Sequence, residues 1–101
     1  MRPLITLTTD FGSRDAYVGA MKGVMLAIEP QAQFVDITHA IPPQNVRHTA
    51  YVLWSALPYY PESAVHLVVV DPGVGTTRRA IASQTPWGWV VGPDNGVFSY
   101  V

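Results

Sequence analysis

The apolar run at residues 64–70 ends abruptly at an acid, Asp71, and this junction constrains the fold of the chain more than any other feature. A continuous run rich in valine and leucine predicts a buried strand of a parallel sheet. A second apolar run, residues 4–8, is soon followed by another acid, Asp10. Open α/β sheets bind ligands beyond the carboxyl ends of their strands, so acids at two strand ends predict a functional edge of the sheet.

Helical and strand patterns alternate along the chain. We expect a helix over residues 16–29, capped by Asp15 and ended by Pro30, and a second helix over residues 46–57, capped by Asn45. Their core-facing residues are expected to be Val18, Met21, Met25 and Ile28 in the first helix, and Val46, Ala50, Leu53 and Leu57 in the second. The expected strands are residues 4–8, 33–37, 64–70, 80–83 and 89–91, the last two forming a hairpin. A β-α-β-α-β start implies right-handed crossovers and a parallel sheet.

Composition excludes several classes of protein. At 101 residues the chain allows one domain at most, and 49% hydrophobic with 13% charged residues argues against a disordered chain. A formal net charge of −1 gives no electrostatic footprint for nucleic acid, and no segment approaches the roughly 18 uninterrupted apolar residues of a membrane span. Without cysteine there are no disulfides or thiolate metal sites. We expect a cytoplasmic protein.

The last residues, 96–101, are apolar and have no polar tail. A chain that stopped there would expose aromatic surface, as a cut interface does. This pattern predicts the N-terminal piece of a longer protein, although a complete small domain ending in a strand stays open.

Asp10 has two interpretations. A carboxylate at a strand end accepts two parallel hydrogen bonds, which suits a ribose 2′,3′-diol, as in dinucleotide-binding folds. An Asx turn or an N-cap for the following helix accounts for Asp10 equally well.

Asp71 and Arg78 form a second candidate constellation. A cation beside the Asp71 carboxylate would keep it ionised, and an ionised acid in a dry pocket orients or deprotonates a water molecule. The alternative is a turn stabilised by a surface ion pair.

The three histidines stand at spacings unlike any metal site. His48 in a helix and His66 in a strand are expected to be structural, whereas His39 borders a proline-rich loop near the functional edge and keeps a ligand or acid–base role open. Other polar and aromatic residues are expected to be cap or turn residues (Asp15, Asp36, Asp94) or to pack in the core and at a helix end (Trp54, Tyr59, Tyr60).

Short motifs spread in order over essentially the whole chain carry a family resemblance. They are Thr8-Thr9-Asp10-Phe11-Gly12, Met21-Lys22-Gly23-Val24-Met25, Asp36-Ile37-Thr38-His39 with Ile41-Pro42-Pro43-Gln44, Asp71-Pro72-Gly73-Val74-Gly75-Thr76, and Gly92-Pro93-Asp94-Asn95-Gly96. Together they resemble the S-adenosylmethionine hydroxide adenosyltransferases, the hydrolase relatives of the fluorinases and chlorinases.

The resemblance implies that water or hydroxide attacks the ribose C5′ of S-adenosylmethionine and releases adenosine and L-methionine. No metal or redox cofactor is implied, because the sulfonium is already an activated leaving group. Asp71 and Arg78 match the first two members of the family's catalytic Asp-Arg-His set, and Asp10 matches the acid that binds the ribose. The fluorinase has a tyrosine in place of Asp71 and a long insertion where this chain has only residues 84–88, so the resemblance favours hydroxide over halide.

The same resemblance implies a three-layer, Rossmann-like α/β domain over residues 1–101 that is incomplete. The catalytic histidine is expected beyond Val101, as is a C-terminal β-barrel domain. Family members are homotrimers with substrate held between two subunits, so we expect this piece to be inactive alone. Two other functions stay open: a noncatalytic module that binds S-adenosylmethionine or adenosine, and a metal-dependent phosphohydrolase that uses Asp10 and Asp71.

Overall fold

The computed structural model of this chain describes residues 2–12, 15–70 and 80–101. Its elements run in the order β1 (Leu4–Thr9), α1 (Tyr17–Ile28), β2 (Gln33–Thr38), α2 (Val46–Ala56), a 3₁₀ helix η1 (Leu57–Tyr59), β3 (Val65–Val69), β4 (Ala80–Thr85) and β5 (Gly88–Pro93). Each element predicted from the sequence is present, with ends within two residues of those expected.

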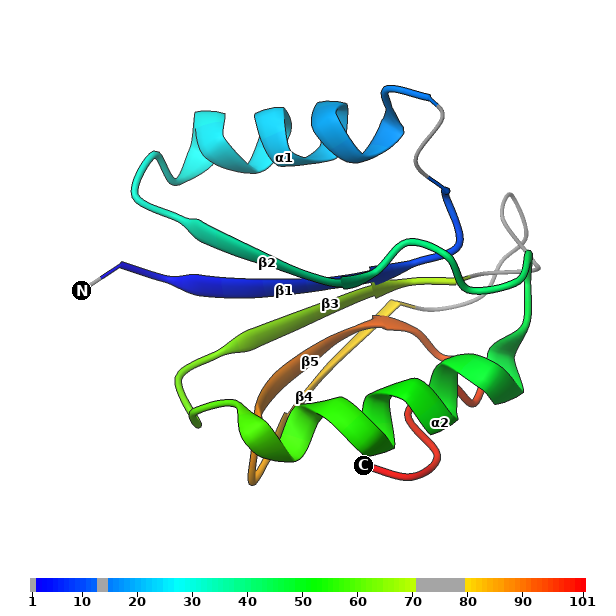
Figure 1. The fold of residues 1–101 in the computed structure, drawn as a ribbon. Helices are drawn as coiled ribbons and strands as arrows, with labels where there is room; N and C mark the ends of the chain where they lie inside the picture. The colour runs from blue at the N-terminus through cyan, green and yellow to red at the C-terminus, as the bar shows by residue number, and fades with distance from the viewer. Residues whose placement is uncertain (1, 13–14, 71–79) are drawn as a thin grey trace.

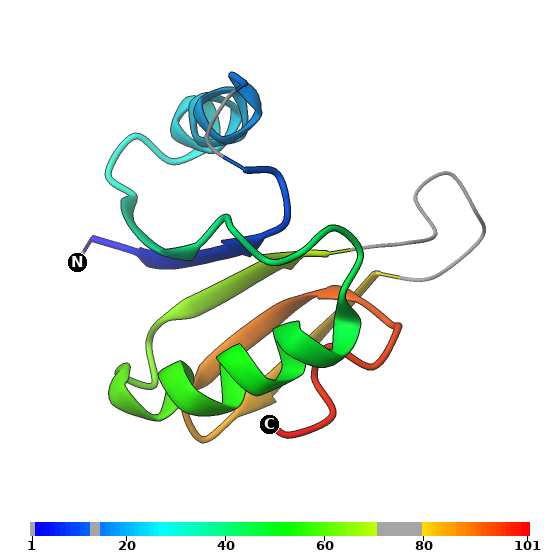
Figure 2. The same cartoon turned by 45° about the vertical axis from the view of Figure 1, so that its right-hand side comes forward.

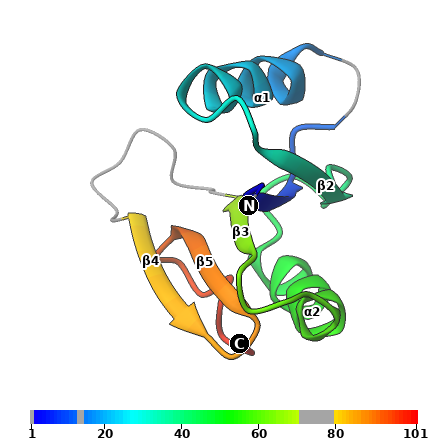
Figure 3. The same ribbon diagram turned by 90° about the vertical axis from the view of Figure 1, so that its left-hand side faces the viewer.

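The strands form one five-stranded sheet in the order β2-β1-β3-β5-β4. Strands β1, β2, β3 and β5 are parallel, and β4 pairs antiparallel with β5 at the edge. Helices α1 and α2 lie on opposite faces of the sheet (Figures 1 and 3). The three-layer α/β fold with a terminal hairpin, predicted from the sequence, is confirmed.

The two faces of the sheet are covered unequally. The main core lies between the sheet and α2, and its fully buried members are Ile41, Leu53, Leu57, Val68, Val70, Val90 and Val97. On β3 the side chains alternate, with His66 and Val68 buried and Val65, Leu67 and Val69 half-buried. The prediction that the run 64–70 is a buried strand of a parallel sheet is thus confirmed for its pairing and for the face toward α2, whereas the face toward α1 is only half-buried.

Helix α1 contributes no fully buried residue. Val18, Met21 and Met25 are half-buried as the periodicity predicts, but Ile28 is 80% exposed. Asp15 is not the cap, since the helix begins after Ala16 with no side-chain cap bond. Polar contacts through Lys22, described with the site below, link this helix to β2.

Helix α2 follows its sequence pattern closely. The Asn45 side chain accepts a hydrogen bond from His48 N at 2.9 Å, which confirms the predicted cap. Ala50 and Leu53 are buried against the sheet, but Trp54 is 56% exposed and does not pack in the core as predicted. Tyr59 lies at the helix end, in η1, but is 88% exposed. Trp54 follows Leu53 by about 100° around the helix, which turns it away from the buried face.

His66 ties the centre of the sheet to the hairpin. Its Nε2 lies 2.8 Å from Trp87 O, and its Nδ1 lies 2.7 Å from Thr6 Oγ1. A carbonyl only accepts, so Nε2 carries the proton and Thr6 donates its hydroxyl to Nδ1. The Tyr60 ring meets the imidazole edge-on at 5.4 Å, and His66 is 1% exposed. The predicted structural role of His66 is confirmed.

Burial lowers the pKa of His66 below its ordinary 6.5, although the hydrogen bond to Trp87 O opposes this. Unfolding then takes up a proton below pH 6.5, so stability that is complete above this pH falls as the pH decreases, by at most about 1.4 kcal/mol per pH unit. We expect His66→Gln to flatten the decline in the free energy of unfolding between pH 7 and 5, measured by urea denaturation. His48→Gln, at an exposed position, is the control; an unchanged slope for His66→Gln would contradict the assignment.

Candidate functional site

The carboxyl ends of the parallel strands gather polar groups at one edge of the sheet. Asp10 follows β1, His39 follows β2, and Asp94 and Asn95 follow β5. The segment between β2 and α2 crosses this edge beside the end of β1 (Figures 1 and 2). This is the edge at which the sequence predicts a ligand site.

Asp10 is held by a partner far away in the sequence. Its Oδ2 accepts a hydrogen bond from the backbone N–H of Gln44 at 2.7 Å. Gln44 has φ +62°, in the left-handed region that non-glycine residues rarely adopt. Neither local interpretation of Asp10 holds, because α1 starts seven residues later and Gly12 N bonds to His39 O instead.

One side of the Asp10 carboxylate is anchored and the other is open. Within the described ranges 2–12, 15–70 and 80–101, no hydrogen-bond donor contacts Oδ1 of Asp10. The side chain is half-buried, so it remains accessible while its direction is fixed by Gln44. A fixed carboxylate with a free oxygen is suited to accept a hydrogen bond from a hydroxyl group of a ligand.

A polar network lies next to Asp10. Thr9 Oγ1 and His39 Nδ1 are 2.7 Å apart, and His39 Nε2 lies 2.8 Å from Asp36 Oδ1. Lys22 Nζ on α1 contacts Asp36 Oδ2 at 2.9 Å and lies 5.9 Å from the centre of the Phe34 ring. Hydrogen bonds from His39 and then from Lys22 hold the pKa of Asp36 below its usual range. The expectation that Asp36 is a cap or turn residue is wrong, since it lies in β2 and binds Lys22 of α1 and His39 of the loop after β2.

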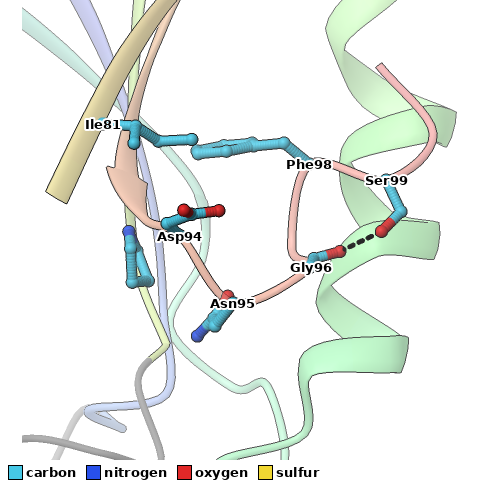
Figure 4. Close-up of a pocket in the computed structure, with 7 residues that line it drawn as sticks. Ile81, Asp94, Asn95, Gly96, Phe98 and Ser99 are labelled. Atoms are coloured by element: carbon cyan, nitrogen blue, oxygen red, sulfur yellow. Dashed lines mark hydrogen bonds between the residues drawn. The ribbon is translucent and has the colours of Figure 1, made fainter. Parts of the chain in front are cut away.

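The turn after β5 forms a pocket of about 240 Å³ at the same edge (Figure 4). Its lining includes Asp94, Asn95 and Phe98, and the predicted turn position of Asp94 is confirmed. Asn95 Nδ2 donates to Val70 O at 3.0 Å, so the amide fixes the end of β3 against this turn. Ser99 Oγ donates to Gly96 O at 2.6 Å and closes the far side.

The two predicted catalytic residues, Asp71 and Arg78, lie outside the described residues. The end of β3, just before Asp71, is among the described residues. Strands β1 and β3 are neighbours with Thr9 opposite Val69, which sets Val70 level with Asp10. The structure thus brings Asp10, the end of β3 and the Asn95 turn to one edge.

The described part of the chain contains no group of three or more His, Cys, Asp or Glu side chains arranged to hold a metal ion. No helix among these same residues is long and apolar enough to cross a membrane.

Gln44 is the site residue that sequence reasoning missed. Its contribution is a backbone N–H, which carries no residue-type signal. The Pro42-Pro43 pair just before it marks a loop but does not say which N–H points at Asp10.

Comparison with known proteins identifies the family. The family model described as the SAM hydroxide adenosyltransferase N-terminal domain matches residues 5–101. This chain belongs to that family. Two relatives named (R)-S-adenosyl-L-methionine hydrolase, from Methanocaldococcus jannaschii and Thermus thermophilus, are 52% and 54% identical over 97% and 98% of the chain. A fluorinase from Actinopolyspora mzabensis is 33% identical over 80% of it.

Similarity to a solved structure extends over nearly the whole chain. A crystal structure of a conserved hypothetical protein from Thermus thermophilus superposes with a TM-score of 0.87 at 53% identity, over 99% of this chain and 41% of that one. The chain spans only 39% and 38% of the length of the two hydrolases that it matches.

Proposed function

We propose that the complete protein carrying this chain hydrolyses S-adenosyl-L-methionine to adenosine and L-methionine. Water or hydroxide would attack the ribose C5′ while the thioether of methionine departs from the sulfonium. The observation that carries the proposal is Asp10, which is fixed by Gln44 N–H and has no donor on Oδ1 among the described residues, in a chain 52% identical to a protein named (R)-S-adenosyl-L-methionine hydrolase.

Asp10 would bind the substrate through the ribose. Each carboxylate oxygen accepts two hydrogen bonds, so Oδ1 and the second lone pair of Oδ2 would each accept from one hydroxyl of a vicinal diol, while Gln44 N–H orients the carboxylate. A ribose held in this way presents C5′ in a fixed direction, which lowers the entropic part of the barrier.

Asp71 and Arg78 would act on the nucleophile. Their motif and spacing match the family's catalytic pair, and β3 delivers the chain to the level of Asp10 at Val70. We assign Asp71 to orient the attacking water and accept its proton as the C5′–O bond forms, and Arg78 to keep the Asp71 carboxylate ionised before the attack. We propose no cofactor, because a sulfonium leaves as a neutral thioether.

The test is product analysis on the complete protein. S-adenosylmethionine is incubated with the protein in the presence of EDTA, and adenosine and methionine are quantified by liquid chromatography. Equal amounts of both products are expected, at a rate unchanged by EDTA. Release that requires added Mg²⁺ would contradict a reaction without a metal. Phosphate release from a nucleotide, with no product from S-adenosylmethionine, would favour a metal-dependent phosphohydrolase. Adenosine that raises the melting temperature without any turnover would favour a binding module.

The proposal extends to the N-terminal position of this chain in a longer protein, since it matches about two fifths of its relatives. The catalytic histidine would lie in the remaining part, so we expect residues 1–101 alone to release no adenosine. We infer a cytoplasmic location because the proposed substrate is made and used there, and we expect neither nucleic acid nor membrane as a partner.

We further propose that the complete protein is a homotrimer, as the family resemblance implies. Three exposed apolar side chains that share one side of α1, at spacings of seven and four residues, support association, because soluble monomers rarely expose contiguous apolar surface; they are Tyr17, Val24 and Ile28. Light scattering coupled to gel filtration is expected to give three times the subunit mass. A measured mass equal to that of one subunit at micromolar concentration would contradict this assembly.

A further inference from the structure

His39 contacts the chain on both sides of Asp10, the residue that we assign to ribose binding. Its ring bonds to the Thr9 hydroxyl, directly before Asp10, and its backbone carbonyl accepts from Gly12 N at 2.8 Å, two residues after Asp10. Phe11 N in turn donates to Thr9 Oγ1 at 3.2 Å. Residues 9–12 are therefore fastened to His39 at two points.

One proton of this network can be assigned. The Asp36 carboxylate accepts, so His39 Nε2 carries a proton and donates it at 2.8 Å. Nδ1 lies 2.7 Å from Thr9 Oγ1 and bonds to it in either protonation state of the ring, as acceptor from the hydroxyl when Nδ1 carries no proton and as donor to the hydroxyl oxygen when it carries one. Lys22 holds the second oxygen of Asp36 and so fixes the far end of the network.

The Thr9, His39 and Asp36 arrangement has the order of a nucleophile triad but not its accessibility. Thr9 is 0% exposed, and its hydroxyl already accepts from Phe11 N. An external substrate has no path to that oxygen. The network is thus built to hold the backbone rather than to attack a bond.

We propose that His39 is a positioning residue for Asp10: by fixing residues 9–12 against the loop that carries Gln44, it keeps the Asp10 carboxylate in the direction required for ribose binding. This inference rests on the proposed function. In this proposal Asp10 binds the ribose, whereas His39 acts only through Asp10 and does not contact the substrate.

The test compares three variants of the complete protein. His39→Asn places its amide oxygen where Nδ1 was and can keep the Thr9 bond, whereas His39→Gln reaches Asp36 but not Thr9. His39→Ala removes both bonds. Because ribose binding is shared by ground and transition states, we expect His39→Ala to raise KM about tenfold with kcat changed by less than about threefold. His39→Asn is expected to recover most of the loss and His39→Gln little of it.

A double-mutant comparison separates positioning from general destabilisation. In an Asp10→Ala background, His39→Ala should weaken adenosine binding no further, as measured by calorimetry. The control is His48→Ala, at an exposed position, which should leave KM and the Kd for adenosine unchanged. An unchanged KM for His39→Ala, or equal losses with and without Asp10, would overturn the proposal.

A second readout does not depend on turnover. Amide exchange at Phe11 and Gly12 should be about tenfold faster in His39→Ala than in the wild type or His48→Ala. If the wild type released no adenosine, the proposed function would fail, while faster exchange would still show that His39 holds residues 9–12. Unchanged exchange would overturn the positioning role whatever the reaction proves to be.

Discussion

Replacing Asp71 by asparagine is expected to reduce the rate of adenosine release by the complete protein by a factor on the order of 10²–10⁴, the usual contribution of a general base. Asparagine keeps the shape of the side chain but cannot take a proton from water. Adenosine binding should remain close to that of the wild type, because the ribose is assigned to Asp10. Turnover is measured by chromatography and affinity by calorimetry on the same preparations.

The matched control is Asp15→Asn, which removes one exposed carboxylate from the loop before α1. It should leave both turnover and affinity unchanged. Full activity in Asp71→Asn would remove Asp71 from the catalytic set. Parallel loss of turnover and adenosine binding would instead assign it to the ligand.

Asp10→Ala is expected to weaken adenosine binding by roughly 1.5–3 kcal/mol, the range for hydrogen bonds to a charged group, which corresponds to about 10- to 150-fold in Kd. The structure gives the reason: Oδ2 is anchored to Gln44 N–H, and no donor among the described residues occupies Oδ1, which leaves it for a ligand hydroxyl. Calorimetric titration of the complete protein with adenosine measures the loss.

The choice of ligand makes this prediction sharper. 2′-Deoxyadenosine lacks one hydroxyl of the diol, so Asp10→Ala should cost much less affinity for it than for adenosine. Equal losses for the two ligands would mean that Asp10 does not bind the diol. Unchanged affinity for adenosine would exclude a ribose role for this residue.

Local sequence signals were sufficient for most of the backbone. The Asn45 cap, the stripe of Ala50 and Leu53 and the run leading to Asp10 are each indicated by residues close together in the sequence, and each is confirmed. Helix α1 shows where periodicity stops being informative. Its apolar residues are placed regularly, but how far a helix is buried depends on what covers it, and Ile28 remains 80% exposed.

The candidate site divides in the same way. That Asp10 lies at a strand end followed from sequence, but its bond to Gln44, 34 residues away, depends on a left-handed backbone at a non-glycine residue. Likewise, the contact of Lys22 with Asp36 joins α1 to β2. Such contacts depend on the tertiary structure, so no local sequence pattern predicts them. Asp71 and Arg78 remain predictions that rest on the family motif.

The most direct test of the central claim is to run the reaction in H₂¹⁸O with the complete protein and to analyse the adenosine by mass spectrometry. Attack of water at the ribose C5′ predicts adenosine that carries one ¹⁸O atom at its 5′-oxygen and methionine without label. Unlabelled adenosine, or no adenosine at all from S-adenosylmethionine, would contradict the account.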